Sequence, residues 1–388
     1  MIRVMHVLSS IKDVKHFTGL AQYHDKALIH MQVCTIDAPG YLQESLAPLG
    51  VPGHSLDCGS RLRYPAAIRR LARLLRRERI DVVHSHLFEP TIIGLLAACV
   101  ARTPGRVLTR HHADLHFFMR KPLHTKLDRW SALLAHRAIA VSEQARQVLV
   151  EMEGVPADRV RVVLPGSFIK AGTRASEEEC RALRREFELD GAYVLGVIAR
   201  LHPIKGHEDL FRALPAVARA HPNVKLLLIG EGWLRPKLES LAAELSITDR
   251  VLFAGYRQDM KQLYGVMDAV VHPSYEDSVA TPVMEGMAYG VPVICTPKGV
   301  ALDLIRNGET GLLVPPGDPA RLAEAILKLA GSPALQRAFS ERGPVEVGDR
   351  FSFAGNARGY ERVYQEVLGD RHPASRAVTV GVEAGGGG

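Results

Sequence analysis

Several features that would narrow the function of a protein are scarce or absent in this chain of 388 residues. Its five cysteines are scattered without the paired spacing of a metal site or a redox motif, which is typical of a reducing compartment. The longest apolar stretch, at about residues 91–100, is far too short to cross a membrane. The first eight residues are too few for the apolar core of a signal peptide and indicate a first strand. We therefore expect a cytoplasmic protein that is soluble, or at most peripheral to a membrane.

Two further absences exclude classes of enzyme. No glycine-rich dinucleotide fingerprint follows the first predicted strand, and Gly230 and Gly232 lack a third glycine at the required spacing, which argues against a dehydrogenase. No Asp-x-Asp sequence occurs, so a common carboxylate pair for a divalent cation is missing. We expect neither a metal ion nor a cofactor.

The positive charge of the chain is concentrated in one segment. Much of the net charge of +7 comes from eight arginines between Arg61 and Arg79, where apolar residues recur at helical spacing. Two interpretations remain open, a solvated helix beside the sheet or a surface for anionic lipid, to which each cation adds about 1 kcal/mol. Residues 116–121 add two phenylalanines beside two cations, which would suit a lipid surface, although these phenylalanines could equally pack in the core or line an acceptor cleft. No nucleic-acid-binding motif accompanies the charge, so no nucleic acid partner is expected.

Both halves of the chain alternate short apolar runs with amphipathic helical patterns, which is typical of parallel, doubly wound α/β sheets. The predicted strands are at about residues 2–8, 33–36, 82–85, 107–109, 138–141 and 160–163, and then 193–199, 225–229, 251–253, 269–272, 293–295 and 312–314. A capping box at Ser176 and Glu179 starts the second domain after a linker at about 164–175. The expected division is a Rossmann-like domain at 1–165, a second at 176–350, a helix at 351–370 and a disordered tail at 371–388.

Cations follow the first strand of the second half. Arg200 and then Lys205, followed by Gly206, lie where that strand ends, at the edge of a parallel sheet where ligands bind. The alternative to a binding site is that both are ordinary solvent-exposed side chains without a ligand. We favour phosphate binding because the loop carries a glycine and lies at a strand exit.

A helix N-terminus follows a later strand. The loop after residue 272 ends at Thr281 and Pro282, which we interpret as the N-cap and the first helical residue. Two cations and a helix N-terminus bind an anion wherever they converge. Glu285, one turn into this helix, can accept hydrogen bonds from sugar hydroxyls, although a first-turn carboxylate is also favoured by the helix dipole alone. Diphosphate plus ribose indicates a nucleotide-sugar.

The chain resembles family 4 of the retaining glycosyltransferases, which have the GT-B fold. The segments that carry the resemblance are Arg200-x4-Lys205-Gly206, Pro273-Ser274, a carboxylate eight residues before Glu285, and Gly290-x-Pro292. Further matches run from about residue 80 onward, at 81–86, 109–112, 140–143, 230–232, 253–256 and 308–317. The resemblance implies two Rossmann-like domains facing each other across a cleft, with the last helix crossing back to the first domain.

The resemblance also implies roles for individual residues. Those assigned to catalysis are His111, Arg200, Lys205 and Asp277, and those assigned to donor binding are Gly19, Gly230, Gly232, Tyr256, Arg257, Glu276, Ser278, Val279, Ala280, Thr281 and Glu285. His111 would point at the transferred sugar, the cations would stabilise the leaving diphosphate, Glu285 would bind the ribose, and backbone groups near Tyr256 would hold the nucleobase.

The chain departs from the family pattern at three places. Asp277 stands where the family usually has glutamate, with Glu276 just before it, so the contact with the donor sugar stays divided between the two. Gly19 is all that remains of the family's Gly-Gly pair in a first loop that also carries Lys12. The linker reads Pro165-Gly166-Ser167 in place of Pro-Asn-Gly.

The pairs His84-x-His86 and His111-His112 leave a zinc site open as an alternative.

The sequence thus predicts a retaining, metal-independent glycosyltransferase. Its donor would be a nucleotide-sugar, UDP-linked in preference to GDP-linked, and its acceptor an unidentified hydroxyl, such as that of a lipid-linked or cell-envelope glycan. Two alternatives stay open. One is an epimerase or hydrolase of nucleotide-sugars with the same fold, and the other is a non-catalytic nucleotide-sugar-binding protein.

Overall fold

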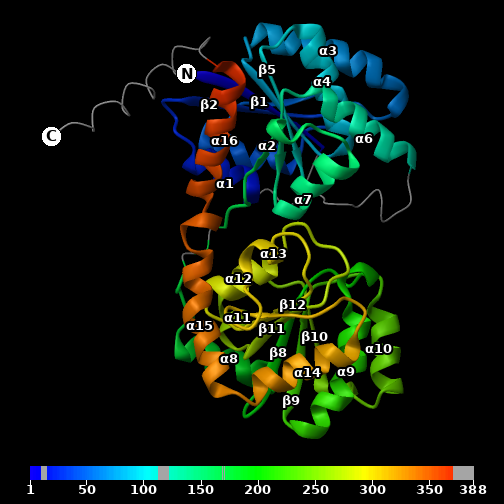
Figure 1. Cartoon of the computed structure of the whole chain (residues 1–388), viewed down its shortest axis with the longest axis vertical. Helices are drawn as coiled ribbons and strands as arrows, with labels where there is room; N and C mark the ends of the chain where they lie inside the picture. Colours follow the sequence, from blue (N-terminus) through cyan, green and yellow to red (C-terminus); the bar gives the residue numbers. More distant parts are fainter. Residues whose placement is uncertain (10–14, 112–121, 168, 170, 370–388) are drawn as a thin grey trace, which may run out of the picture. The chain divides into compact units, whose positions relative to one another are not determined.

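The computed structural model describes residues 1–9, 15–111, 122–167, 169 and 171–369, and it divides into two compact units (Figure 1). The first unit comprises Met1–Gly166 together with the chain from Ser352 onward, and the second comprises Ser167–Phe351. Each unit contains one parallel sheet flanked by helices, which confirms the predicted α/β class. The loop residue Lys12, His112, the aromatic segment 116–121 and the tail 371–388 lie outside the described residues.

The sheet of the first unit has seven parallel strands in the order β3-β2-β1-β4-β5-β6-β7. The strands are β1 (Ile2–Leu8), β2 (Ile29–Thr35), β3 (Gly53–Ser55), β4 (Val82–His86), β5 (Gly105–Arg110), β6 (Arg137–Ala140) and β7 (Val160–Val162). The sequence missed β3, a three-residue edge strand without a buried side chain. The chain order reverses between β1 and β4, and ligands of doubly wound sheets bind at such a position.

Helices cover both faces of this sheet. They are α1 (Lys15–Tyr23), α2 (Tyr41–Leu46), α3 (Tyr64–Arg77), α4 (Phe88–Ala101), α6 (Pro122–Leu134), α7 (Glu143–Gln147) and α16 (Phe353–Leu368), with short turns η1 (Ala47–Leu49), η2 (Arg61–Arg63), η3 (Val148–Met152) and η4 (Ala157–Arg159). The turn η7 (Asp349–Phe351) just before α16 belongs to the second unit. One core lies under α1, α2 and α16 and the other under α3 and α4. The C-terminal helix α16 lies beside α1, so segments from opposite ends of the chain build one layer (Figure 1).

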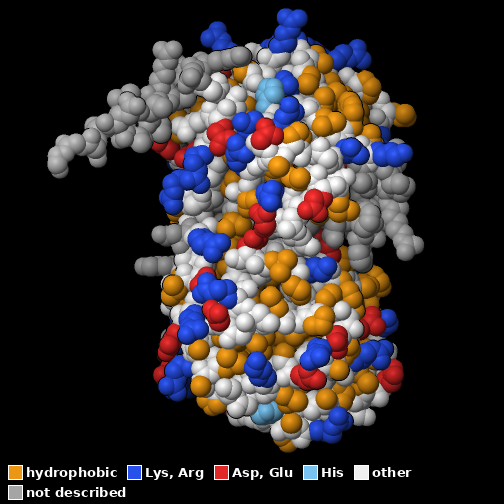
Figure 2. All heavy atoms as spheres, viewed as in Figure 1, with side chains coloured by type: hydrophobic (Ala, Val, Ile, Leu, Met, Phe, Trp, Pro, Cys, Tyr) orange, Lys and Arg blue, Asp and Glu red, His pale blue; other side chains and the backbone are white. Residues whose placement is uncertain are grey.

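The basic segment forms the amphipathic helix that its spacing predicts. Leu71 and Leu75 are 0% and 1% exposed, whereas the arginines of α3 that are exposed are Arg69, Arg70, Arg73, Arg76 and Arg77. Figure 2 shows Lys and Arg side chains projecting from the part of the first unit where Figure 1 places α3. Among the described residues, no helix combines the length and the apolarity needed to cross a membrane.

The sheet of the second unit has six parallel strands in the order β10-β9-β8-β11-β12-β13. The strands are β8 (Tyr193–Ile198), β9 (Val224–Ile229), β10 (Val251–Gly255), β11 (Ala269–His272), β12 (Val293–Cys295) and β13 (Leu312–Leu313). The helices are α8 (Glu177–Glu186), α9 (His207–Ala220), α10 (Arg235–Glu244), α11 (Met260–Gly265), α12 (Thr281–Ala288), α13 (Ala301–Leu304), α14 (Pro319–Ala330) and α15 (Pro333–Val347), with turns η5 (Pro203–Lys205) and η6 (Thr248–Arg250).

Close packing holds α12 against its sheet. A Cβ on Gly286 would lie 3.0 Å from Val270 and 3.2 Å from Val293, so the glycine lets the helix approach β11 and β12 closely. The apolar side chains of α9, α10 and α14 form the core on the opposite face. The start of α8 has the predicted capping box, because Ser176 Oγ accepts from Glu179 N at 3.2 Å and the Glu179 carboxylate accepts from Ser176 N at 2.7 Å.

Candidate active site

The loop after β8 is held against the loop after β11 at a glycine. Gly206 has φ of 68°, and a Cβ there would lie 1.9 Å from the carbonyl oxygen of Pro273. Both the left-handed backbone and this close approach require glycine. The contact places Lys205, the residue before it, beside the segment that follows β11.

Hydrogen bonds join the same two loops. The carbonyl oxygen of Ile204 accepts from Tyr275 N at 2.8 Å and from Ser274 Oγ at 3.0 Å. Thr296 Oγ1, after β12, donates to the carbonyl oxygen of Ser274 at 2.5 Å. The exits of β8, β11 and β12, which are neighbours in the sheet, are therefore joined into one edge, and Lys205 lies at the β8 exit.

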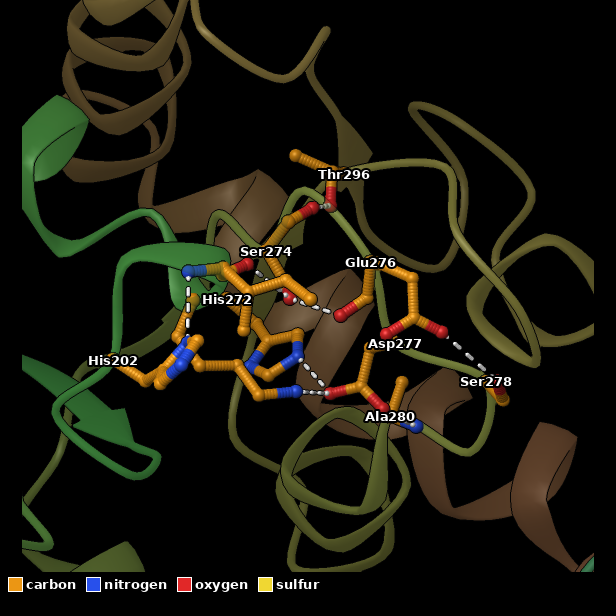
Figure 3. A network of polar contacts seen from close by, with 10 residues as sticks. His202, His272, Ser274, Glu276, Asp277, Ser278, Ala280 and Thr296 are labelled. Atoms are coloured by element: carbon orange, nitrogen blue, oxygen red, sulfur yellow. Dashed lines mark hydrogen bonds and ion pairs between the residues drawn. The ribbon is translucent and has the colours of Figure 1, made fainter. Parts of the chain in front are cut away.

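Asp277 binds the lysine directly, and Figure 3 shows it between His272 and Ala280. Its Oδ2 accepts from Lys205 Nζ at 2.7 Å and from His272 Nε2 at 2.8 Å, and its Oδ1 accepts from Ala280 N at 2.9 Å. Burial would raise the pKa of Asp277, but the hydrogen bond and charge of His272 and the charge of Lys205 hold it well below its usual range. Asp277, to which the sequence assigned a contact with the donor sugar, is thus an ionised anchor for Lys205 and His272.

The neighbouring Glu276 lies on a different side of the loop (Figure 3). It is 8% exposed, and its Oε1 accepts from Ser278 Oγ at 3.2 Å. Its backbone carbonyl accepts from Ser274 Oγ at 2.7 Å. The two adjacent carboxylates therefore bind different partners, and only Asp277 is joined to the cation.

The start of α12 differs from the expectation by one residue. Thr281 is the first helical residue and Pro282 the second, whereas the cap position is taken by Ala280, with φ of 47° and ψ of 47°. Asp277 Oδ1 accepts from the backbone N–H of Ala280, three residues later, and so caps the helix. This hydrogen bond holds Ala280 in a left-handed conformation, which costs a residue other than glycine about 1 kcal/mol. Such strain is retained where the surrounding structure imposes it, often at functional sites.

Glu285 is fixed by a tyrosine that the sequence did not single out. Glu285 Oε2 accepts from the hydroxyl of Tyr264 at 3.0 Å, and Tyr264 is 0% exposed. Burial, and then the charge of Glu285, raise the pKa of Tyr264 well above its usual value, so the hydroxyl stays a donor. Tyr264 belongs to α11, and no motif in that helix pointed to it.

The glycines after β9 have a packing role. Cβ atoms on Gly230 and Gly232 would lie 2.1 Å from the carbonyl oxygen of Ala199 and 2.2 Å from that of Leu201. They let the β9 loop approach the backbone on both sides of Arg200, whose side chain is exposed. The pair thus positions the β8 exit through backbone contact.

The segment after β10 carries an arginine that is bound by two carboxylates. Arg257 forms ion pairs with Glu186 and Asp259, each at 2.6 Å, and hydrogen bonds to Asp259 and then to Glu186 raise its pKa further. Tyr256 is 69% exposed. A ligand at this loop would therefore meet the Tyr256 ring and backbone groups, while the guanidinium is occupied within the protein.

The remaining predicted residues lie in the first unit. His111, just after β5, has Nε2 at 3.0 Å from His86 Nδ1. Gly19 is buried within α1, where a Cβ would lie 2.3 Å from the Phe353 ring, so packing against α16 accounts for this glycine. His84 and His86 cluster with His6, and each of the three offers one nitrogen within 4.8 Å of the others.

Comparison with known proteins decides the family. The model described as "Glycosyltransferase Family 4" matches residues 14–167, and that described as "Glycosyl transferases group 1" matches residues 181–345. The chain belongs to the family 4-like glycosyltransferases of GT-B fold. The first match ends at residue 167, beside the boundary between the two structural units, and the second begins at residue 181 within the second unit, so each unit corresponds to one half of a GT-B glycosyltransferase.

Curated relatives within this group have several functions. A D-inositol 3-phosphate glycosyltransferase of Acidothermus cellulolyticus is 33% identical over 244 residues, which cover 60% of this chain and 53% of the relative. A 2-deoxystreptamine glucosyltransferase of Streptomyces kanamyceticus is 27% identical over 322 residues, which cover 78% of this chain and 82% of the relative. The chain spans about half the length of the first of these relatives.

Solved structures show the same fold. The Anabaena protein HepE, determined in complex with UDP, superposes with a TM-score of 0.83 over 94% of this chain and 100% of that one, at 21% identity. A glycosyltransferase from Rickettsia africae superposes with a TM-score of 0.81 over 95% and 99%, at 18% identity. At these identities the likeness establishes the fold.

Proposed function

We propose that the protein is a retaining glycosyltransferase that transfers a sugar from a nucleotide-sugar, UDP-linked in the first place, to a hydroxyl acceptor without a metal ion. The observation that carries the proposal is the anchored lysine. The ionised Asp277 holds Lys205, whose side chain is 15% exposed, at the edge where three strand exits are joined. The strained start of α12 follows Asp277 in the same loop. A fixed cation at a helix N-terminus suits an anionic leaving group.

Family membership supports the assignment of roles. Lys205 and Arg200 would stabilise the charge that develops on the leaving diphosphate, together with backbone groups near Ala280. Glu285, oriented by Tyr264, would accept hydrogen bonds from the ribose. Relatives named as glycosyltransferases, and the UDP and UDP-glucose complexes of HepE, support a nucleotide-sugar donor and favour uridine.

The proposed chemistry needs no separate base. The acceptor hydroxyl would attack the anomeric carbon from the side of the leaving group, the bond to the diphosphate would break, and a diphosphate oxygen would take the proton of the hydroxyl. His111 would contact the transferred sugar. Cations supplied by the protein would do the work of a metal ion on the diphosphate.

The test is a comparison of donors. Thermal melting is measured with UDP, GDP, ADP and their glucose or mannose conjugates, because a ligand that binds only the folded state raises its stability by about 2.7 kcal/mol at a hundred times its Kd. We expect the uridine compounds to raise the melting temperature most. If none of the nucleotides does so, the proposal is wrong.

Two other functions give different results in the same series. An epimerase or hydrolase would change the donor when it is incubated alone, which sugar analysis detects. A non-catalytic binding protein would bind the donor and transfer to no acceptor, whether phosphoinositol, aminocyclitol or lipid-linked glycan. The anchored lysine favours an enzyme that breaks the bond to the diphosphate over a binding protein, since a preorganised cation at the leaving group assists bond cleavage. The acceptor assay then separates the transferase from the hydrolase.

A further inference from the structure

A row of histidines crosses three neighbouring strands in the first unit. His6 lies on β1, His86 on β4 and His111 just after β5, and these strands are adjacent in the sheet. The register pairs His6 with His84 and His86 with Thr109. Residues two apart on a strand share a face, so His6, His84, His86 and His111 all project toward the same layer.

Successive hydrogen bonds connect three of these rings. His6 Nδ1 lies 2.9 Å from His86 Nε2, and His86 Nδ1 lies 3.0 Å from His111 Nε2. Both nitrogens of His86 are thus engaged with other imidazoles. His84 is separate from this row, because its Nδ1 bonds the Tyr364 hydroxyl at 2.7 Å and its Nε2 bonds Thr109 Oγ1 at 2.6 Å.

The row is covered by apolar and aromatic side chains. The ring centroid of Phe17 lies 5.7 Å from that of His6 and 5.1 Å from that of His86, and Tyr360 and Tyr364 of α16 pack on His84. His6 is 2% exposed and His86 is 1% exposed. Burial, followed by the charge of His16, lowers the pKa of His6 to about 3, and burial also lowers the pKa of His86 well below its usual value. Both rings are therefore neutral at ordinary pH.

A neutral imidazole has one protonated nitrogen, which donates a hydrogen bond, and one unprotonated nitrogen, which accepts one. In a row of such rings all the hydrogen bonds therefore point the same way along the row. If His6 donates to His86, then His86 donates to His111, and His111 must carry its own proton on Nδ1. In the opposite direction a neutral His111 donates from Nε2, and its Nδ1 carries no proton. A change at His6 therefore reaches His111 through the tautomer of His86.

We infer that His6 and His86 are positioning residues that set which ring nitrogen of His111 carries the proton. Under the proposed function, on which this consequence rests, that choice decides whether His111 offers the transferred sugar a donor or an acceptor. The hydrogen-bonded row itself does not depend on that function.

A metal ion is the competing occupant of the same cluster. Two nitrogens on one tetrahedral zinc lie about 3.3 Å apart, from metal–nitrogen distances near 2.05 Å. The separations of 2.9 Å and 3.0 Å are those of hydrogen bonds, and His84 already uses both nitrogens on hydroxyls. The three histidines that could reach one ion, His6, His84 and His86, are joined by no carboxylate or thiolate within the described cluster.

The test measures tautomers directly. In full-length protein labelled with ¹⁵N-histidine, long-range ¹H–¹⁵N spectra distinguish protonated from bare ring nitrogens, and His111→Asn assigns the His111 signals. We expect His6→Leu to change the ¹⁵N shifts of His111, although His6 bonds only His86 in this row. His6→Asn places an amide near the position of Nδ1 and should restore the wild-type pattern.

His84→Leu is the matched control, because His84 is equally buried and its ring centroid lies 4.2 Å from that of His86. It should leave the His111 signals unchanged, whereas an equal change would show that packing is responsible and would overturn the inference. Unchanged His111 signals in both His6→Leu and His86→Phe would also overturn it. So would zinc at one equivalent shifting His6, His84 and His86 together, which would identify a metal site.

Activity separates the inference from the proposed function. If transfer occurs, His6→Leu should lower kcat about tenfold with little change in the donor KM, and His6→Asn should recover it. An unchanged kcat beside a changed His111 tautomer would mean that His111 does not act on the sugar. Loss of the proposed function would leave the spectra to decide the inference alone.

Discussion

At the scale of single residues, the two candidate phosphate-binding cations are held differently. Lys205 is bound by Asp277 and stands 15% exposed, whereas the Arg200 side chain is exposed. An anchored cation is preorganised for charge that develops at a leaving group and costs little to reorganise. We therefore expect Lys205 to contribute to turnover and Arg200 to contribute to turnover and donor capture.

Lys205→Ala should lower kcat on the order of a hundredfold or more, because one preorganised electrostatic contact is lost at the leaving group. Arg200→Ala should lower kcat/KM to a similar extent. The measurement is steady-state transfer with melting temperature as a folding check. Lys328→Ala removes an exposed lysine from α14 and serves as the control. Wild-type turnover in the folded Lys205 variant would contradict the assignment.

Asp277→Asn tests the anchor by stability and pH. The pKa of Asp277 is lower in the folded state than in the unfolded state, where it is about 4. Its carboxylate therefore stabilises the fold fully above about pH 4, and this stabilisation is lost as the pH falls toward the folded pKa. The variant should be less stable by about 1–3 kcal/mol at pH 7, and the difference should narrow below about pH 4. Urea unfolding at pH 7, 5 and 3 measures this.

The matching control replaces a surface carboxylate of the same type. Asp249 has a side chain that is 73% exposed, and Asp249→Asn should change the free energy of unfolding little at any of these pH values. An Asp277→Asn protein as stable as the wild type at pH 7 would remove the anchoring role.

The sequence pointed to some of these residues and not to others for a physical reason. Lys205, Asp277 and Glu285 stand at fixed spacings along the chain, so a motif can identify them. His272 and Tyr264 act through contacts made only in the folded unit, and His6 joins the histidine row from a strand some eighty residues away from His86. A histidine as the last residue of a strand, which is the case for His272, was the one local signal available.

At the scale of helices and strands, periodicity was sufficient for most of the sheet. Every predicted strand is present, because buried parallel strands are continuous apolar runs. β3 was missed since its three residues, Gly53–Ser55, lack that signal. The cap of α12 was misplaced because the Asp277 carboxylate accepts from the backbone N–H of Ala280, three residues later, and residue preferences at Thr281 do not reveal this turn.

A buried ion-pair cluster ties β5 to two neighbouring segments of the first unit. Arg110 Nη1 lies 2.7 Å from Asp128 Oδ1 on α6, and Arg110 Nη2 lies 2.6 Å from Glu153 Oε2, which follows η3. All three side chains are less than 10% exposed. Arg110→Met should cost about 3–5 kcal/mol of unfolding free energy, because two buried carboxylates lose their ion pairs with the guanidinium.

Calorimetry or urea unfolding measures this loss, with Arg146→Met as the control. Arg146 pairs with Glu143 at 2.5 Å, with side chains 36% and 44% exposed, and a pair so accessible to water contributes less than about 1 kcal/mol. Neutralising both carboxylates in Arg110→Met, with Asp128→Asn and Glu153→Gln, should recover part of the loss. Equal effects of the two single arginine variants would mean that burial of the cluster contributes nothing.

The basic face of α3 is the basis of a prediction about membrane surfaces. Its exposed arginines would add about 1 kcal/mol each near an anionic bilayer. We expect the protein to sediment with vesicles containing phosphatidylglycerol at low salt and to be released at high salt. A variant with Arg69, Arg70 and Arg73 changed to glutamine should lose this binding. Sedimentation that ignores lipid charge would favour the solvated-helix interpretation.

At the scale of the whole molecule, the chain is not divided at a single point. The first unit takes its last layer from α16, whose Tyr360 and Tyr364 are buried against the histidine-bearing strands. Without α16, residues 1–166 would therefore leave part of their hydrophobic core exposed to solvent. The second unit, by contrast, is one continuous stretch of chain that carries Lys205, Asp277 and Glu285 together.

The last prediction concerns metal independence of the whole enzyme. The chain contains no Asp-x-Asp, and in the described part of the second unit Asp277 is already bound by Lys205 and His272. Under the proposed function, Lys205 and Arg200 would meet the charge that a divalent ion would otherwise neutralise on the diphosphate. Transfer should therefore persist in excess EDTA at a rate within about twofold of the untreated protein. A loss of activity that added magnesium or manganese alone restores would overturn the proposed role of the two cations. The Lys205→Ala variant is assayed with and without magnesium in the same way. A modest rescue of its activity by magnesium would show that the ion and the lysine neutralise the same negative charge on the diphosphate.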